Sequence, residues 1–318
     1  MTNYLQHISS SSNKLLSIII VNWNSGNLLE NCINSIDSSS IDKDKIEVFV
    51  VDNNSSDDSV SFQFPHYCNV IINKENIGFG HACNIAYKEC DSDFILLLNP
   101  DAQVSENVIS YSLDFALKNP AYSIFGVQQR DENNDILRTC GRFPTLTTFF
   151  LDALGVSKSF PQYFTSAPLM AEWDHRSDRV VDHVMGSYML IRKADINEPF
   201  LFDDDFFMYY EDLDLSYRMM MKGKLSYFIA GLNVFHECGG TSKKVKAKRL
   251  YYSLFSKLLF QKKHSKPFVY FLSILMVFVL EFPARFFYTI FRFDISEMID
   301  FFQGYSMLVR RFFKLKIF

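Results

Sequence analysis

Short apolar runs alternate with stretches of helical spacing along the first hundred residues. The runs are rich in β-branched residues, as in strands that a parallel sheet buries on both faces. We expect strands at residues 15–21, 46–51, 70–72 and 94–98. Apolar residues recur at helical spacing over 28–36 and 81–90, and Ser56 or Asp57 could cap a further short helix. Strands alternating with helices predict an α/β fold with an open, Rossmann-like, mostly parallel sheet.

Polar side chains follow the carboxyl end of each expected strand. They are Asn22 and Asn24, Asp52 and Asn54, Asn76, and Asp101. Each could be only a turn residue, because Asn and Asp are common turn formers. Four in succession favour a shared crevice, since ligands of open α/β sheets bind at this edge. There, the Asp52 carboxylate could accept hydrogen bonds from a pyrimidine or a ribose, and Asp101 could bind a divalent metal that bridges two phosphates.

Three acids crowd the start of an expected helix at 210–222, which Gly223 would terminate. Acids are common at helix N-termini, and Asp214 can form an ordinary ion pair with Arg218. Glu211 and Asp212 also follow the aromatic run 206–210, and an apolar surrounding can raise the pKa of an acid toward that of a useful base.

The segments around this helix are less distinctive. Residues 128–182 are irregular and could form loops over an acceptor, while 181–192 predicts a turn and a strand. His236 could supply a second metal ligand through its neutral imidazole, with phosphate-binding donors at 239–242, although a lone histidine is more often structural.

Charge divides the chain in two. Residues 1–242 hold 17 basic and 32 acidic residues, whereas 243–318 hold 15 basic and 4 acidic ones. An acidic body is a poor partner for nucleic acid. The six cysteines form no C-x-x-C pair and fit a reducing compartment. Residues 1–14 show no signal pattern, and we expect a flexible tail on a cytoplasmic protein.

The basic segment continues into an apolar one. Residues 267–280 are uncharged, but Glu281, Pro283 and Arg285 interrupt the run before it reaches the ~20 residues of a membrane span. An aromatic-rich face beside Lys and Arg favours a helix in the interface at the inner face of the cytoplasmic membrane. A core helix, a re-entrant hairpin or a tilted span toward Phe293 are the alternatives. We therefore divide the chain into 1–14, a catalytic domain at 15–242 and a helical, membrane-associating segment at 243–318.

Five ordered blocks resemble the family 2 glycosyltransferases, which have the GT-A fold. The blocks are SIIIVNWNSGNLLENCINSI (17–36), VVDNNSSDDS (50–59), NIGFGHACNIA (76–86), LLLNPDA (96–102) and FDDDFFMYYEDLDLSYRMMMKG (202–223). VMGSYMLIRK (184–193) and HECGGTS (236–242) join the pattern. The set looks most like the rhamnosyltransferase branch, which commonly transfers rhamnose from dTDP-rhamnose, with inversion, to saccharides on a polyprenyl diphosphate carrier in O-antigen or capsule synthesis.

The resemblance also implies roles for individual residues. Asp52 should bind the nucleotide base or ribose. Asp101 stands at the family's D-x-D metal site and should bind Mg²⁺ or Mn²⁺ with His236, although Asn99 replaces the first Asp and leaves one charge fewer. Asp212 is the expected catalytic base, with Glu211 as the alternative. The expected nucleotide-sugar contacts are Val21, Asn22, Asn24, Asp52, Asn54, Asn76, Gly78, Asn84, Asn99, Asp101 and Gly186.

Three other classes of protein compete with this interpretation. A nucleotidyltransferase should carry a Gly-rich, basic loop after the first strand, where this chain has Asn22-Trp23-Asn24-Ser25-Gly26. A dinucleotide dehydrogenase should carry G-x-G-x-x-G there. A membrane-docked, sugar-nucleotide-binding scaffold without activity is compatible with Asn99, but Asp101, Asp212 and His236 argue against it.

Overall fold

The computed structural model describes residues 14–160, 163–164, 169–237 and 245–312. Ten strands form one sheet, in which the order of the main path is β3-β2-β1-β4-β11-β6-β12-β5. The strands of this sheet are β1 (Lys14–Asn22), β2 (Ile46–Asp52), β3 (Cys68–Ile72), β4 (Ser92–Leu98), β5 (Ala102–Val104), β6 (Tyr122–Arg130), β7 (Ile136–Leu137), β9 (Arg179–Val181), β11 (Tyr188–Arg192) and β12 (Leu225–His236). A separate pair joins β8 (Cys140–Gly141) to β10 (His183–Val184).

The four strands expected from the sequence are confirmed and form the parallel half, β3-β2-β1-β4. The second half is mixed, because β11 runs antiparallel to β4 and β6 while β12 runs parallel to β6. This arrangement brings the end of β12, at His236, beside β5 and therefore close to the end of β4. The carboxyl edge of the parallel half thus meets residues that lie more than a hundred positions later in the chain.

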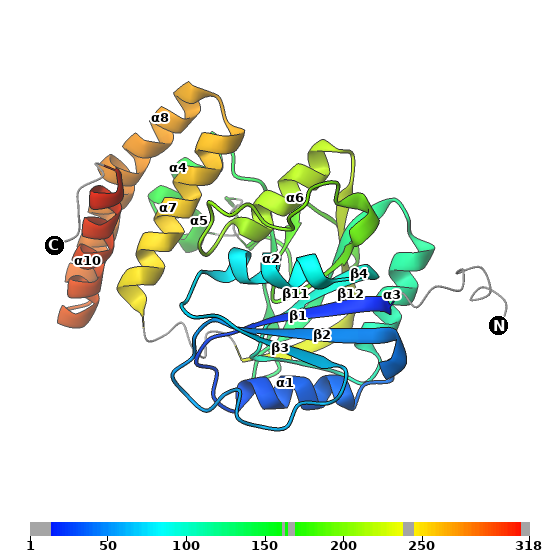
Figure 1. The fold of residues 1–318 in the computed structure, drawn as a ribbon. Coiled ribbons are helices and arrows are strands. Elements are labelled where there is room, and N and C mark those ends of the chain that lie inside the picture. Colours follow the sequence, from blue (N-terminus) through cyan, green and yellow to red (C-terminus); the bar gives the residue numbers. More distant parts are fainter. Residues whose placement is uncertain (1–13, 161–162, 165–168, 238–244, 313–318) are drawn as a thin grey trace.

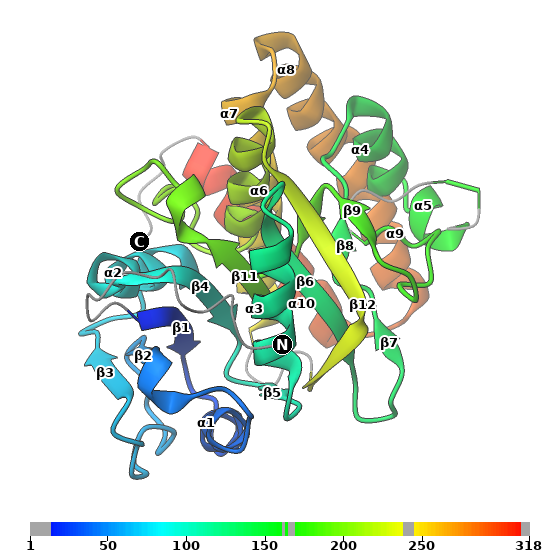
Figure 2. The same ribbon diagram turned by 90° about the vertical axis from the view of Figure 1, so that its right-hand side faces the viewer.

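Helices cover both faces of the sheet (Figures 1 and 2). They are α1 (Leu28–Asp37), α2 (Phe79–Glu89), α3 (Val108–Lys118), α4 (Leu146–Ala153), α5 (Val156–Ser159), α6 (Glu211–Met221), α7 (Lys246–His264), α8 (Pro267–Leu275), α9 (Phe282–Phe291) and α10 (Ile295–Phe312), with 3-10 turns at Lys43–Lys45 and Lys193–Asp195 and a π-helical turn, η5, at Met276–Glu281.

Alternation along the strands builds two cores. Leu16, Ile18 and Ile20 of β1 pack with α1 and α3, whereas Ile19 and Val21 pack with α2 and α6. Successive side chains of a strand point to opposite faces, so the buried run in β1 supplies both layers. The expected helices over 28–36, 81–90 and 210–222 are confirmed within one or two residues at each end.

One local prediction is wrong. Ser56 and Asp57 cap no helix, because residues 53–67 contain none. The Asp57 carboxylate instead accepts hydrogen bonds from the N–H of Gly26 at 2.8 Å and from the hydroxyl of Ser59 at 2.6 Å. The acid therefore stabilises the turn after β1, a tertiary partner that the local sequence does not reveal.

The C-terminal helices form a bundle beside the sheet domain (Figure 1). Leu254 and Leu258 of α7, Val277 of η5 and Tyr305 of α10 share a buried cluster with Phe149 of α4. Within the described residues, Pro267–Phe291 is the one helix long and apolar enough, by length and composition, to cross a membrane. Its outer side exposes large apolar residues, including Phe268, Phe271, Val279, Phe287 and Phe291.

Candidate active site

A pocket of about 720 Å³ lies at the carboxyl edge of the sheet. Strand ends and the loops after them form one part of its wall, the start of α6 forms another, and α4 and α7 close the far part. Eight of the predicted residues line it: Val21, Asn76, Asn99, Asp101, Gly186, Glu211, Asp212 and His236. The topology therefore brings the end of β4, the end of β12 and the start of α6 to one place.

Asp52 lies next to the pocket lining, in a buried hydrogen-bond network. Its carboxylate accepts from the Asn22 amide at 2.7 Å and from the N–H and hydroxyl of Ser55 at 3.0 and 2.6 Å. Asn24 adds a contact across the same turn, since its side-chain oxygen accepts from the N–H of Ser56 at 2.7 Å. Asn54 is exposed, with a φ of 63°. These residues hold the loops after β1 and β2 together.

Two other predicted residues lie outside the lining and connect α2 to the segment before α6. Gly78 has a φ of +91°, and a Cβ there would lie 2.3 Å from the carbonyl oxygen of Phe207. The Asn84 side chain donates to the carbonyl of Phe202 at 2.6 Å and accepts from the N–H groups of Leu201 and Phe202. Both residues therefore position the chain that leads to Glu211 and Asp212.

Asp101 and His236 meet inside the pocket. The Nε2 of His236 lies 3.1 Å from Oδ1 of Asp101 and 3.5 Å from the amide nitrogen of Asn99. Both Asp101 and His236 also make interactions beyond these contacts. The expected phosphate donors at 239–242 lie outside the described residues. A carboxylate and an imidazole at this separation provide two of the ligands that a divalent cation needs. Among the described residues, no group of three or more His, Cys, Asp or Glu side chains forms a complete metal site.

Glu211 and Asp212 occupy very different surroundings. Glu211 is buried, and its Oε2 has no hydrogen-bond partner among the residues that the structure describes. Burial together with the negative charge of Asp212 raises its pKa well above the usual range. Asp212 is partly exposed, and its carboxylate accepts from the N–H groups of Gly186 at 3.0 Å and Leu213 at 2.8 Å. Asp212 therefore presents a hydrogen-bonded carboxylate to the pocket, whereas burial favours the protonated form of Glu211.

His183, which the sequence analysis missed, lies behind Asp212. Its Nε2 is 3.7 Å from Oδ2 of Asp212, and its Nδ1 is 3.2 Å from the Ser216 hydroxyl. That hydroxyl donates to the Asp212 carbonyl at 3.0 Å, so it accepts from Nδ1–H and leaves the Nε2 lone pair facing Asp212. Burial lowers the pKa of His183 and keeps the ring neutral.

The backbone immediately before the acids is strained. Tyr209 and Tyr210 have φ values of 66° and 70°, in the left-handed region that side chains rarely adopt. Helix α7 holds this segment: Phe207 stacks on Tyr252 at 4.5 Å, and the Ser256 hydroxyl donates to the Met208 carbonyl at 2.8 Å. The C-terminal helices therefore form part of the site.

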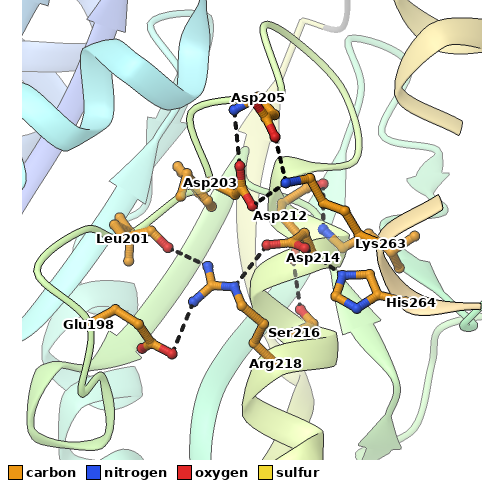
Figure 3. A network of polar contacts seen from close by, with 12 residues as sticks. Glu198, Leu201, Asp203, Asp205, Asp212, Asp214, Ser216, Arg218, Lys263 and His264 are labelled. Carbon is orange, nitrogen blue, oxygen red and sulfur yellow. Dashed lines mark hydrogen bonds and ion pairs between the residues drawn. The ribbon is translucent and has the colours of Figure 1, made fainter. Parts of the chain in front are cut away.

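A polar network ties the far side of α6 to the end of α7 (Figure 3). His264 lies 2.6 Å from the buried carboxylate of Asp214, which also receives a bond from Arg218 at 2.8 Å. Lys263 bridges Asp203 and Asp205 at 2.8 and 2.6 Å. The sequence predicts the pair between Asp214 and Arg218, but helical spacing cannot reveal the partners from α7.

An α/β sheet flanked by helices, with aspartates and a histidine around a pocket at its carboxyl edge, fits a glycosyltransferase of the GT-A type. The chain belongs to glycosyl transferase family 2, whose model matches residues 17–198, more than half of its length.

Several characterised proteins are similar to the chain. It is 31% identical to rhamnosyltransferase WbbL of Escherichia coli over 168 residues, which are 50% of this chain and 60% of WbbL. It is 25% identical to the N-acetylglucosaminyl-diphospho-decaprenol L-rhamnosyltransferase of Mycobacterium tuberculosis over 235 residues, which are 70% of this chain and 76% of that protein.

Solved structures share the fold. The mannosyltransferase PcManGT of Pyrobaculum calidifontis, in complex with GDP-Man and Mn²⁺, aligns with a TM-score of 0.57 at 12% identity and covers 98% of this chain and 92% of its own. Residues 1–349 of TarS from S. aureus align with a TM-score of 0.52 at 12% identity, over 93% of this chain and 80% of that one.

Proposed function

We propose that this protein transfers a sugar, with inversion, from a nucleoside diphosphate donor to a hydroxyl of a lipid-linked saccharide in the synthesis of a cell-surface polysaccharide. The observation that carries the proposal is one pocket that contains the hydrogen-bonded carboxylate of Asp212 together with the Asp101–His236 pair. A single displacement needs a base for the acceptor and a stabilised leaving diphosphate. The two carboxylates fit these two roles.

Asp212 is the proposed catalytic base. The N–H groups of Gly186 and Leu213 hold its carboxylate in the pocket, and it can accept the proton of the acceptor hydroxyl as that oxygen attacks the sugar. The Nε2 lone pair of His183 can then accept a hydrogen bond from the protonated carboxyl. The raised pKa of Glu211 leaves that residue protonated and therefore unsuited to the role of base.

Asp101 and His236 are the proposed ligands of a divalent cation on the donor diphosphate. The Nε2 of His236 and the Oδ1 of Asp101 lie 3.1 Å apart, a separation at which both atoms can bind one cation. When bound, Mg²⁺ or Mn²⁺ would supply positive charge to the departing diphosphate. The mannosyltransferase from P. calidifontis was solved with Mn²⁺, which supports this assignment.

The names of two relatives support a particular donor and acceptor. Two of them are named rhamnosyltransferases, and the mycobacterial one is named for a sugar on diphospho-decaprenol. We propose dTDP-rhamnose as the donor, with UDP-sugars as the alternative, and a polyprenyl-diphosphate-linked saccharide as the acceptor. Asp52 lies beside the pocket and is the proposed contact for the nucleotide.

The membrane is the proposed location of this acceptor. Helix 267–291 packs one side on α7 and α10, where Ser273 and Val277 are fully buried. Glu281 pairs there with Lys257 at 3.1 Å and with Arg285 at 2.8 Å. The opposite side is apolar and exposed, which supports a helix that lies in the inner interface of the cytoplasmic membrane.

A donor screen tests the function. The protein is mixed with Mg²⁺ or Mn²⁺ and a panel of dTDP-, UDP- and GDP-sugars, and thermal shift and transfer to a polyprenyl-diphosphate sugar are measured. We expect one donor to give a metal-dependent shift that Asp101→Ala and Asp52→Ala abolish. Asp93→Ala, an exposed acid at the opposite end of β4, is the matched control. A folded protein that responds to no donor would instead favour the inactive scaffold.

A further inference from the structure

Helix α7 presents a polar stripe to the pocket. Arg249, Ser253 and Lys257 line it at intervals of four residues, so they lie on one face of the helix. Across from this stripe, Phe149 and Asp152 of α4 complete the same part of the wall. These residues come from the last third of the chain or from α4, whereas Asp101 and His236 stand at strand ends.

Arg249 is the cation of this stripe with the most free capacity for hydrogen bonds. Its Nε donates to the Tyr209 hydroxyl at 3.3 Å, and its Nη atoms have no hydrogen-bond partner among the described residues. A guanidinium has five N–H donors in a planar fork, which suits the oxygens of a phosphate. Tyr209 lies three residues before Asp212, so Arg249 is close to the proposed base.

Lys257 adds positive charge deeper in the same part of the pocket. Its ammonium lies over the ring of Phe149, 3.9 Å from the centroid, and bonds to Glu281 at 3.1 Å. Glu281 is shared with Arg285, so these three residues carry a net positive charge. Asp152 of α4 is a second acid in this region; it accepts a hydrogen bond from the Ser157 hydroxyl and makes a further interaction.

The stripe lies between the pocket and the exposed apolar helix. The other sides of α7 pack Leu254 and Leu258 against Val277 of η5. Helix α7 therefore contacts both the pocket that contains Asp212 and the apolar helix. A membrane-anchored acceptor places its charged group between its sugar and its chain, in the same order as Asp212, the stripe and the apolar helix.

We propose that Arg249, with Lys257, forms a binding site for the phosphate groups that join the acceptor sugar to its lipid. This inference rests on the proposed function. The donor also contains a diphosphate. The experiment must therefore distinguish binding of the donor diphosphate from binding of the acceptor diphosphate. Asp101 and His236 lie beside the strands β5 and β12, whereas Lys257 of the α7 site lies against Phe149 of α4, which favours the acceptor for the α7 site.

The test compares two acceptors that carry the same sugar. One is a short polyprenyl diphosphate and the other is a neutral alkyl glycoside. For the wild-type chain and Arg249→Gln, kcat/KM is measured for each acceptor, together with the KM of the donor. We expect the substitution to reduce the preference for the diphosphate acceptor by about tenfold or more, because a hydrogen bond to a charged group is lost, with the donor KM unaltered.

A control variant and the pattern of losses distinguish the possible roles of Arg249. Lys248→Gln removes an exposed charge from the neighbouring position of α7, outside the pocket lining, and should retain the wild-type preference. An equal loss with both acceptors would mean that Arg249 acts only by holding Tyr209, and a rise in donor KM alone would assign the site to the donor. Either result overturns the inference. A wild-type chain that transfers to neither acceptor overturns the proposed function itself, and this inference with it.

Discussion

The two ends of the pocket are built in different ways. At the sheet edge, Asn22, Asp52 and Ser55 are bonded to one another within adjoining loops, and ordinary turns connect them to buried strands. At the far end, the strained pair Tyr209–Tyr210 depends on α7. The proposed donor site can form with the sheet, whereas the proposed acceptor site includes residues of the C-terminal helices. Asp212 lines the pocket at the start of α6, two residues after Tyr210.

Removal of all residues after 242 should have the largest effect, because it removes α7 and leaves the sheet. Without α7, the stacking of Tyr252 on Phe207 and the bond from Ser256 to Met208 are lost. We expect no measurable sugar transfer, because the wall of the acceptor end and the support of Asp212 disappear together. Transfer assays on the truncated chain, with circular dichroism to verify folding, check this. A folded truncated chain with normal transfer would show that α7 is not part of the site.

The substitution Asp212→Asn tests the residue at the junction. It preserves the size of the side chain and removes its basicity, so kcat should fall by about 10²–10⁴-fold. Donor binding, measured by calorimetry, should remain close to that of the wild-type chain. The same change at Asp214, which is buried in the network of Figure 3, should instead lower the melting temperature. A variant Asp212→Asn that transfers normally would exclude Asp212 as the base.

The exposed face of helix 267–291 differs from α7 in that no described residue covers it. Simultaneous replacement of Phe268, Phe271, Phe287 and Phe291 by Ser removes much of its apolar area. Membrane partition scales with buried apolar area, so binding to anionic vesicles in a flotation assay should weaken by about 100-fold. Replacement of Tyr111 and Leu117, exposed apolar residues of α3, is the control. Equal flotation of both variants would contradict a membrane-binding role for this face.

Gly78 links the two ends of the pocket. An alanine there combines a positive φ with a 2.3 Å approach to a backbone oxygen, so we expect a loss of about 1–3 kcal/mol or more in the free energy of unfolding. Chemical denaturation measures this loss. Gly155, also at positive φ but with open space around its Cβ position, is the matched control and should lose less on substitution by alanine. Equal losses would show that the contact with Phe207 contributes little.

Features of the fold and the site could be predicted from the sequence where they depend on neighbouring residues, and could not where they depend on contacts between distant parts of the chain. The strands, α1, α2 and α6, and Asp101 near the end of β4, could be predicted because apolar runs and the polar residues after them are local signals. His183 and Arg249 could not, since their importance comes from contacts with Asp212 and Tyr209, 29 and 40 positions away. The strand predicted within 181–192 is confirmed as β11, but the direction of its pairing could not be predicted for the same reason. β11 joins β4 across about ninety residues, and nothing in its own sequence states the direction of pairing.

The smallest expected effect is the pH dependence of stability that distinguishes Glu211 from its neighbour Asp212. Burial and the charge of Asp212 raise the pKa of Glu211 in the folded chain. At pH values between the ordinary pKa of a glutamate and this raised pKa, Glu211 therefore keeps a proton in the folded chain and loses it in the unfolded chain. The free energy of unfolding therefore falls as pH rises through this window. Glu211→Gln removes this pH-dependent contribution of Glu211 to stability. The melting temperature of the variant minus that of the wild-type chain should therefore rise from pH 5 to pH 8, while transfer activity is retained. A difference in melting temperature that does not change with pH would show that Glu211 is ionised in the folded protein, and loss of transfer in a stable variant would reopen its claim to be the base.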